Sequence, residues 1–177
     1  MGKPQTKRPP ALEGDTAAPA GDGAPDHLTE AIELLFFAYR DFISDPDEIL
    51  IEYGFGRAHH RVVHFVGRNP GITVAELLDI LRITKQSLAR VLKQLIERGF
   101  IEQETGKQDR RQRMLFLTAT GRELAQRLEA PQRTRVAAAL EKAGPGASAA
   151  WRTVLLALVN EEDRPEVETL IAKTPAG

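Results

Sequence analysis

The chain has 177 residues, no cysteine and a formal net charge of −1. This length allows one domain with a real core, or one small domain with helical extensions. The lack of cysteine excludes disulfides, thiolate nucleophiles, thiol redox sensing and cysteine-based zinc sites. No apolar run is long enough to span a bilayer, and no apolar stretch follows the basic N-terminal residues, so we expect a cytoplasmic protein without a secretory signal.

Charge is distributed unevenly along the chain. Residues 1–81 hold seven Lys or Arg and thirteen Asp or Glu, residues 82–113 hold nine and four, and residues 114–177 hold eight of each. The positive charge is therefore concentrated in one middle block. Residues 1–25 are rich in Pro, Gly and Ala, and their apolar content is too low to offset the entropy of ordering, so we expect a disordered tail.

An apolar stripe predicts a helix after this tail. Its members recur at spacings of four and three residues and are Leu28, Ile32, Leu35, Tyr39 and Phe42. The sequence SDPDE then predicts a new helix start, with Asp45 as the cap, Pro46 at the first position and Glu48 three residues after the cap. Two glycines in YGFG interrupt the pattern, and a further helix is expected over residues 57–66, before the turn GRNPG.

The middle of the chain predicts a helix-turn-helix. Thr73 and Glu76 form a capping-box signature for a short helix that ends near residue 82. Thr84 can cap a second helix, and Gly99 stands where a left-handed residue would end it. The apolar face of this second helix consists of Leu88, Val91, Leu92, Leu95 and Ile96. Its other face is polar and carries Lys85, Gln86, Arg90, Lys93, Gln94 and Glu97.

The periodicity changes after Gly99 and predicts a β-hairpin. FIEQET alternates, RMLFLT is a second strand-like run, and the basic turn 107–113 lies between them. Thr118 then caps a long helix in which Pro131 either introduces a kink or marks a restart. AGPGAS breaks the chain before an apolar helix that contains Trp151, Val154, Leu155, Leu158 and Val159, and Pro165 can begin a short terminal helix.

A helix-turn-helix followed by a two-stranded hairpin is a winged helix, so the predicted fold class is mainly α with a small β-hairpin wing. The second helix can lie in the DNA major groove, and the basic hairpin tip then falls near the backbone or a minor groove. A charge cluster alone is more often a solvated loop, but its position after a polar helix favours DNA binding. The candidate DNA-binding residues are Thr84, Lys85, Gln86, Ser87, Arg90, Lys93, Lys107, Arg110, Arg111 and Arg113.

The terminal helices predict a homodimer. The first helix and the last apolar helix would each expose a large apolar patch in a monomer, unless they pack against each other within one chain. Two-fold symmetry would place two recognition helices about 34 Å apart, one turn of DNA. We therefore expect an N-terminal dimerisation helix and connector over 26–56, a winged helix-turn-helix over 57–118, and C-terminal dimerisation helices over 119–177.

Residues 71–121 resemble the MarR family of bacterial winged-helix regulators. The marks are ITVAELLDILRITKQSLARVLKQLIERGFI, then Asp109-Arg110-Arg111, then LFLTATG, which match the family's wing pattern and its entry into a long helix. The resemblance covers roughly residues 26–160. The whole pattern of LLFFAYRDF followed by GFGRAHHRVVHFVGRNPGITVAELLDILRITKQSLARVLKQLI looks like the PetP-type subgroup. The resemblance implies homodimers on a pseudo-palindromic double-stranded DNA operator, with Arg111 in the minor groove and Asp109 fixing the wing.

The resemblance also implies a small-molecule effector, often an aromatic acid, bound between the dimer helices and the DNA-binding lobe. The candidate pocket residues are Phe36, Arg40, Tyr53, Arg57, His60 and His64. An Arg beside aromatic rings could bind a carboxylate, but Arg40 and Arg57 could equally pair with acidic residues such as Asp41 or Glu33.

His60 and His64, four residues apart on a helix, leave several alternatives open. They could pack at a junction, contact an effector, or bind a metal or haem, although two imidazoles make an incomplete metal site. The metalloprotease HExxH arrangement is absent because Arg61 follows His60. We expect neither an enzyme nor a resident cofactor. The alternatives to a DNA-binding regulator are a winged-helix protein-interaction module and a metal- or haem-responsive sensor.

Overall fold

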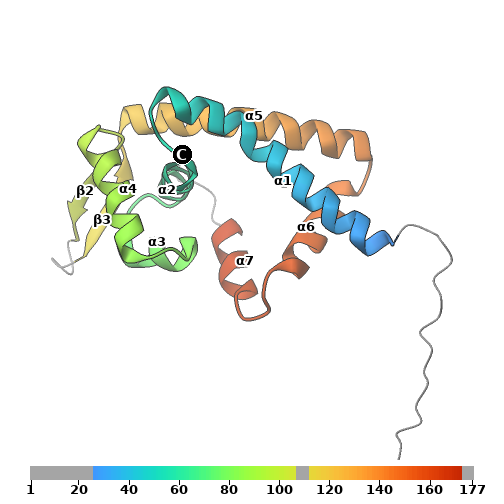
Figure 1. Cartoon of the computed structure of the whole chain (residues 1–177). Coiled ribbons are helices and arrows are strands. Elements are labelled where there is room, and N and C mark those ends of the chain that lie inside the picture. The colour runs from blue at the N-terminus through green and yellow to red at the C-terminus, as the bar shows by residue number, and fades with distance from the viewer. Residues whose placement is uncertain (1–25, 107–111, 173–177) are drawn as a thin grey trace, which may run out of the picture. The chain divides into compact units, whose positions relative to one another are not determined.

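The computed structural model describes residues 26–106 and 112–172 (Figure 1). Its elements in chain order are α1 (His27–Glu52), α2 (Arg57–Arg68), β1 (Ile72–Thr73), α3 (Val74–Leu81), α4 (Lys85–Glu97), β2 (Ile101–Thr105), β3 (Arg113–Leu117), α5 (Ala119–Ala143), α6 (Ala147–Leu158) and α7 (Arg164–Ala172). The chain divides into two units, Met1–Phe36 and Phe37–Gly177, and α1 runs across their boundary. The predicted tail, residues 1–25, lies outside the described residues.

The helix-turn-helix consists of α3 and α4, and side-chain caps fix where each begins. Thr73 Oγ1 accepts the Glu76 N–H at 3.2 Å, and the Glu76 carboxylate accepts the Thr73 N–H at 2.8 Å. Thr84 Oγ1 accepts the Ser87 N–H at 3.1 Å at the start of α4. Between the helices, Arg82 adopts a left-handed conformation with φ 49°. Both predicted caps are confirmed, and with them the helix-turn-helix.

The predicted hairpin is confirmed and forms part of a small sheet. The strand order is β1-β3-β2 and every pairing is antiparallel, with Ile101 opposite Leu117 and Thr105 opposite Arg113. Gly99, at φ 74°, ends the second helix in the left-handed conformation that its position predicts. The two-residue strand β1 was not predicted because two residues carry no periodic signal. The fold is a winged helix-turn-helix with flanking helices.

One hydrophobic core supports the winged helix and extends beyond residues 57–118. α1 contributes Leu50, the following loop contributes Phe55, and α5 contributes Leu124 and Leu128, all buried. The remaining buried apolar residues are Val62, Val63, Val66, Ile72, Leu77, Leu81, Leu88, Val91, Leu92, Leu95, Phe100, Ile101, Leu115 and Leu117. The end of α1 and the beginning of α5 are therefore structural parts of the winged-helix lobe.

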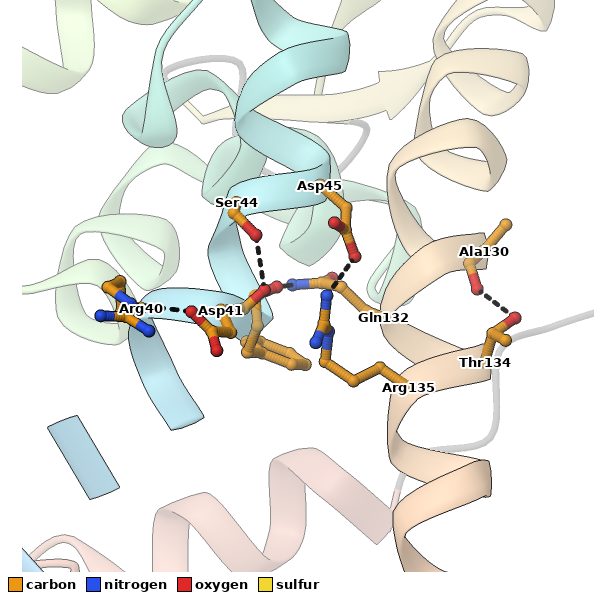
Figure 2. Close-up of polar contacts among 9 residues, drawn as sticks. Arg40, Asp41, Ser44, Asp45, Ala130, Gln132, Thr134 and Arg135 are labelled. Carbon is orange, nitrogen blue, oxygen red and sulfur yellow. Dashed lines mark hydrogen bonds and ion pairs between the residues drawn. The ribbon is translucent and has the colours of Figure 1, made fainter. Parts of the chain in front are cut away.

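α1 continues through Pro46, so the prediction that a new helix begins at Asp45 was wrong. Pro46 has no N–H, and the Phe42 carbonyl therefore lacks the donor that an α-helix normally supplies. Gln132 of α5 fills this place, because its Nε2 donates to the Phe42 oxygen at 3.3 Å (Figure 2). Asp45 does not cap a helix; its carboxylate accepts from Arg135 at 2.8 Å. A contact with α5 thus compensates for the proline.

The C-terminal half of the chain contains three helices. Thr118 caps α5, as predicted, by accepting the Gly121 N–H at 3.0 Å. α5 continues through Pro131, which excludes a restart there. Gly144 ends α5, and α6 and α7 follow at the positions that the chain break and Pro165 predict. Neither α6 nor α7 contains a buried residue, and large apolar side chains of both helices, such as Trp151, Leu158 and Ile171, are exposed within one chain.

Candidate nucleic-acid interface

The apolar face of α4 fixes which side of the helix meets solvent. Leu88, Val91, Leu92 and Leu95 are buried in the core. Because side chains three and four residues apart share a face, this burial turns the polar residues outward. The predicted DNA-binding residues Lys85, Gln86, Arg90 and Lys93 are all exposed. One surface of α4 therefore presents them together.

The hydroxyls at the beginning of α4 are mutually bonded. Thr84 Oγ1 accepts the Ser87 N–H and donates to Ser87 Oγ at 2.9 Å. The Thr84 hydroxyl is thus committed to the cap, whereas the Ser87 hydroxyl keeps its own proton for another acceptor. Of these two predicted residues, the geometry favours Ser87 as the one that could contact a base or phosphate.

The cations of α4 differ in whether they form an ion pair. Within the described ranges, Lys85 and Arg90 have no acidic partner, whereas Lys93 lies 3.8 Å from the Glu97 carboxylate. A cation without an ion pair can approach phosphate or a guanine edge without first breaking a contact. Lys85 and Arg90 are therefore the best-placed charged groups of α4 for nucleic acid.

The base of the wing is ordered by a cross-strand contact. Arg113 Nη1 donates to Thr105 Oγ1 at 2.8 Å, across the last register pair of β2 and β3. The predicted tip residues Lys107, Asp109, Arg110 and Arg111 lie outside the described residues, so their roles stay predictions.

A cavity of about 370 Å³ lies between α2, the wing strands and the first half of α5. His60 and His64 both line it, as do the apolar residues Val63, Phe116 and Leu117. Polar groups from α5, among them Glu129, line another side. A mixed apolar and polar lining of this size suits a small organic molecule.

The protein surroundings favour the neutral form of both histidines. Burial lowers the pKa of His60, charge on His64 lowers it further, and Asp47 opposes the shift. His64 lies at an exposed position, yet the protein around its ring displaces enough water to lower its pKa. The charge on Arg68 acts in the same direction, while Glu129 opposes it.

The other predicted pocket residues do not line this cavity in a single chain. Arg40 pairs with Asp41 at 2.8 Å, and Arg57 pairs with Asp47 at 2.8 Å. Both thus form the ion pairs that the sequence left open as an alternative, although the partner of Arg57 is not one of the residues suggested. The Tyr53 hydroxyl accepts a hydrogen bond from Arg127. Phe36, at the end of the N-terminal unit, is exposed.

His59 was not predicted as a site residue, but it makes a direct contact with α4. Its Nε2 lies 2.6 Å from Gln94 Oε1, and its Nδ1 accepts the Gly56 N–H at 3.1 Å. Only a weak feature of the sequence indicates this contact. His59 stands three residues after the residue that caps α2, where Glu or Gln normally completes a capping box. Histidine can occupy that place because an unprotonated ring nitrogen is also an acceptor.

His60 and His64 do not find further metal ligands in the part of the chain that the structure describes. No group of three or more His, Asp or Glu side chains there is arranged to hold a metal ion. Among the same residues, no helix combines the length and apolar character needed to cross a membrane.

Comparison with known proteins places this geometry in a family. Residues 53–112 match the profile of the MarR family. The chain is 45% identical, over 160 residues, to the HTH-type transcriptional regulator PetP of Rhodobacter capsulatus, and the match covers 88% of this chain and 96% of PetP. The chain belongs to the MarR family.

Two solved structures share the fold. Streptococcus pneumoniae FabT, crystallised in complex with DNA, matches with a TM-score of 0.66 and 19% identity over 74% of this chain and 94% of FabT. An uncharacterised SlyA-like transcription regulator from Listeria monocytogenes matches with a TM-score of 0.60 and 21% identity over 82% of this chain and 97% of its own. At sequence identities this low, these matches show that the fold is shared and nothing more.

Proposed function

We propose that this MarR-family chain is a transcriptional regulator that binds double-stranded DNA sequence-specifically as a homodimer. The observation that carries the proposal is the solvent face of α4, where Lys85 and Arg90 are exposed and form no ion pair with any residue that the structure describes, on a helix whose other face is buried in the core. In a winged helix this is the helix that enters the major groove. The relationship to PetP, a helix-turn-helix regulator, supports the same function.

The wing would supply the second DNA contact. Arg113 at its base, with Lys107, Arg110 and Arg111 toward its tip, would contact the sugar-phosphate backbone or the adjacent minor groove. Asp109 would hold the tip by pairing with a nearby Arg. This arrangement lets α4 contact bases while the wing contacts the backbone.

The terminal helices would hold two copies together on a pseudo-palindromic operator. Large apolar side chains of α1 and α6 are exposed in one chain, including Leu28 at 75%, Phe36 at 68% and Leu158 at 63%. Exposure of this extent on two separate helices is typical of surfaces that a partner covers. In this arrangement residues 57–118 bind DNA, and the dimer is formed by the exposed apolar side chains within 26–56 and 119–177, while the end of α1 and the beginning of α5 support the winged helix.

A small molecule in the α2–α5 cavity would modulate DNA binding. Neutral His60 and His64 can each donate and accept one hydrogen bond, and the apolar lining suits an aromatic body. Such a ligand would contact α2, which also supports α4. Arg40, Tyr53, Arg57 and Phe36 remain candidates for contacts that a dimer brings closer.

The proposal is tested by selecting duplexes from a random DNA library with the purified protein. We expect enrichment of a two-fold-related motif, and affinity that falls steeply with salt because phosphate contacts release counterions. Failure to enrich any motif would reject sequence-specific binding.

Arg90→Ala tests the role of α4 within this function. Loss of a base contact should weaken binding to the selected duplex about tenfold, while affinity for a scrambled duplex changes less. Lys142→Ala, which removes one positive charge from an exposed site at the far end of α5, is the matched control. An unchanged ratio of the two affinities in Arg90→Ala would remove this residue from base recognition.

A further inference from the structure

The His59 ring joins the beginning of α2 to the recognition helix α4. Nδ1 accepts the Gly56 N–H at 3.1 Å, so this nitrogen carries no proton. Nε2 must then carry the ring proton, and the group opposite it, 2.6 Å away, must be an acceptor. The Gln94 amide therefore presents its oxygen, and the two partners fix one neutral tautomer of the imidazole. We call Gly56, His59 and Gln94 the His59 bridge.

The bridge rests on a rigid aromatic surface. The His59 ring stacks on Phe55 with centroids 4.5 Å apart and planes at 10°. Phe55 is itself buried and meets Phe100 edge to face at 5.4 Å. The Arg98 guanidinium, just after α4, lies 4.4 Å from the Phe55 ring centroid. Because the ring is held against the core, a hydrogen bond from it restrains the position of its partner.

Gln94 lies on the side of α4 that carries the candidate base-contacting residues. Gln86, Arg90 and Gln94 are spaced by four residues, and residues at this spacing stack along one side of a helix. A rotation of α4 that moved Arg90 across a groove would also pull Gln94 away from Nε2. The bridge therefore restrains the rotation of α4 about its own axis.

We propose that His59 is a positioning residue for DNA recognition, which sets the rotation of α4 through Gln94. This inference rests on the proposed function, since it assigns His59 a part in sequence-specific binding. His59 itself need not touch DNA. Its effect should appear in the preference for one sequence over another, because a rotated helix still carries its charge to the phosphates.

The test uses full-length protein and two duplexes: one selected from a random library by the parent, and a scrambled version of it. His59→Phe keeps a ring against Phe55 and removes both nitrogens, whereas Gln94→Met replaces the amide with a thioether, a much weaker acceptor, and leaves the Gly56 contact in place. Each variant should lower the ratio of selected to scrambled affinity about fivefold, the scale of one hydrogen bond. The double variant should lose no more than either single variant, because both changes break the same contact.

A second readout follows the ring directly. In ¹⁵N NMR spectra of the parent, His59 should show a protonated Nε2 and an unprotonated Nδ1, and Gln94→Met should abolish the slowly exchanging Nε2 proton. A merely structural histidine would lower the melting temperature of His59→Phe and leave the affinity ratio of Gln94→Met unchanged.

Three results would overturn the inference. The affinity ratio could be the same in both single variants as in the parent. The two losses could add in the double variant, which would mean that Gln94 contacts DNA on its own. A parent that selects no duplex would reject the proposed function together with the inference, whereas unchanged ratios on a duplex that the parent does select would reject only the inference.

Discussion

At the scale of single residues, the histidines of the α2–α5 cavity link stability to pH. Their pKa values lie below the ordinary value of 6.5 in the folded chain, so the unfolded chain binds more protons just below that pH. Above about pH 6.5 the two histidines are neutral, so their lowered pKa values do not reduce the free energy of unfolding there. The free energy of unfolding should therefore fall as the pH is lowered through 6.5 toward the depressed values. Urea unfolding at several pH values measures this slope.

A variant with His60→Gln and His64→Gln provides the control for this prediction. It should show a shallower dependence of unfolding free energy on pH than the parent, because the two shifted groups are gone. Equal slopes for parent and variant would mean that the acid sensitivity of the fold comes from other groups.

The same stretch of sequence shows where prediction of single residues succeeds and where it stops. The spacing of His60 and His64 predicts one shared face, and both do line one cavity. His59 has no such spacing partner, and its role depends on Gln94, which is 35 residues away and belongs to another helix. Ion pairs were foreseen for Arg40 and Arg57 beside the effector role, with Asp41 correctly named for Arg40. Asp47, the partner of Arg57, was not named, because it lies ten residues away in sequence.

At the scale of elements, the contact between Gln132 and α1 should carry measurable stability. Gln132→Leu leaves the Phe42 carbonyl without its donor, and we expect a loss of about 1 kcal/mol in the free energy of unfolding. Denaturant unfolding measures it. Thr134→Ala is the matched control on α5, because the Thr134 hydroxyl donates to the Ala130 carbonyl of its own helix (Figure 2).

Restoring the N–H that Pro46 lacks shows whether Gln132 stabilises the fold through its hydrogen bond to the Phe42 carbonyl or through packing. In a Pro46→Ala background the new N–H can reach the Phe42 carbonyl, so Gln132→Leu should then have a smaller effect. An equal loss in both backgrounds would show that Gln132 acts through packing and not through this carbonyl.

Three helix starts were predictable because the cap and the N–H that it accepts stand three residues apart. Thr73, Thr84 and Thr118 each bond a backbone N–H three positions ahead, which the sequence alone reveals. The continuation of α1 past Pro46 was not predictable in this way. It depends on Gln132, which is 90 residues away, so the local proline signal pointed to an incorrect start.

At the scale of the whole molecule, the exposed apolar helices predict that the chain does not function alone. Trp151 is 49% exposed and Leu158 63% exposed on α6. Replacing both with Glu would place two charges in the proposed dimer interface, so the mass measured by sedimentation should fall from that of a dimer to that of a monomer. Affinity for a two-fold-related operator should fall with it, because one protomer contacts only one half-site.

Lys142→Glu is the control for this prediction, since it adds negative charge at an exposed site of α5 without altering an apolar one. The far-UV circular dichroism of the α6 variant should match that of the parent, as neither Trp151 nor Leu158 belongs to the core. A variant that remains dimeric would place the interface elsewhere.

The core shared by α1, the winged helix and α5 also limits how such a chain can recombine. Leu50, Leu124 and Leu128 fill the lobe from outside residues 57–118, so a gene fusion that transplanted only that segment would leave holes where these side chains belong. If the exchanged segment instead began ahead of Pro46 and ended beyond Gln132, all core residues would come from the same parent protein. Chimeras between relatives, natural or engineered, should therefore fold when their junctions lie in α1 ahead of Pro46 and in α5 beyond Gln132. They should fail to fold when the junctions lie at the ends of the winged helix.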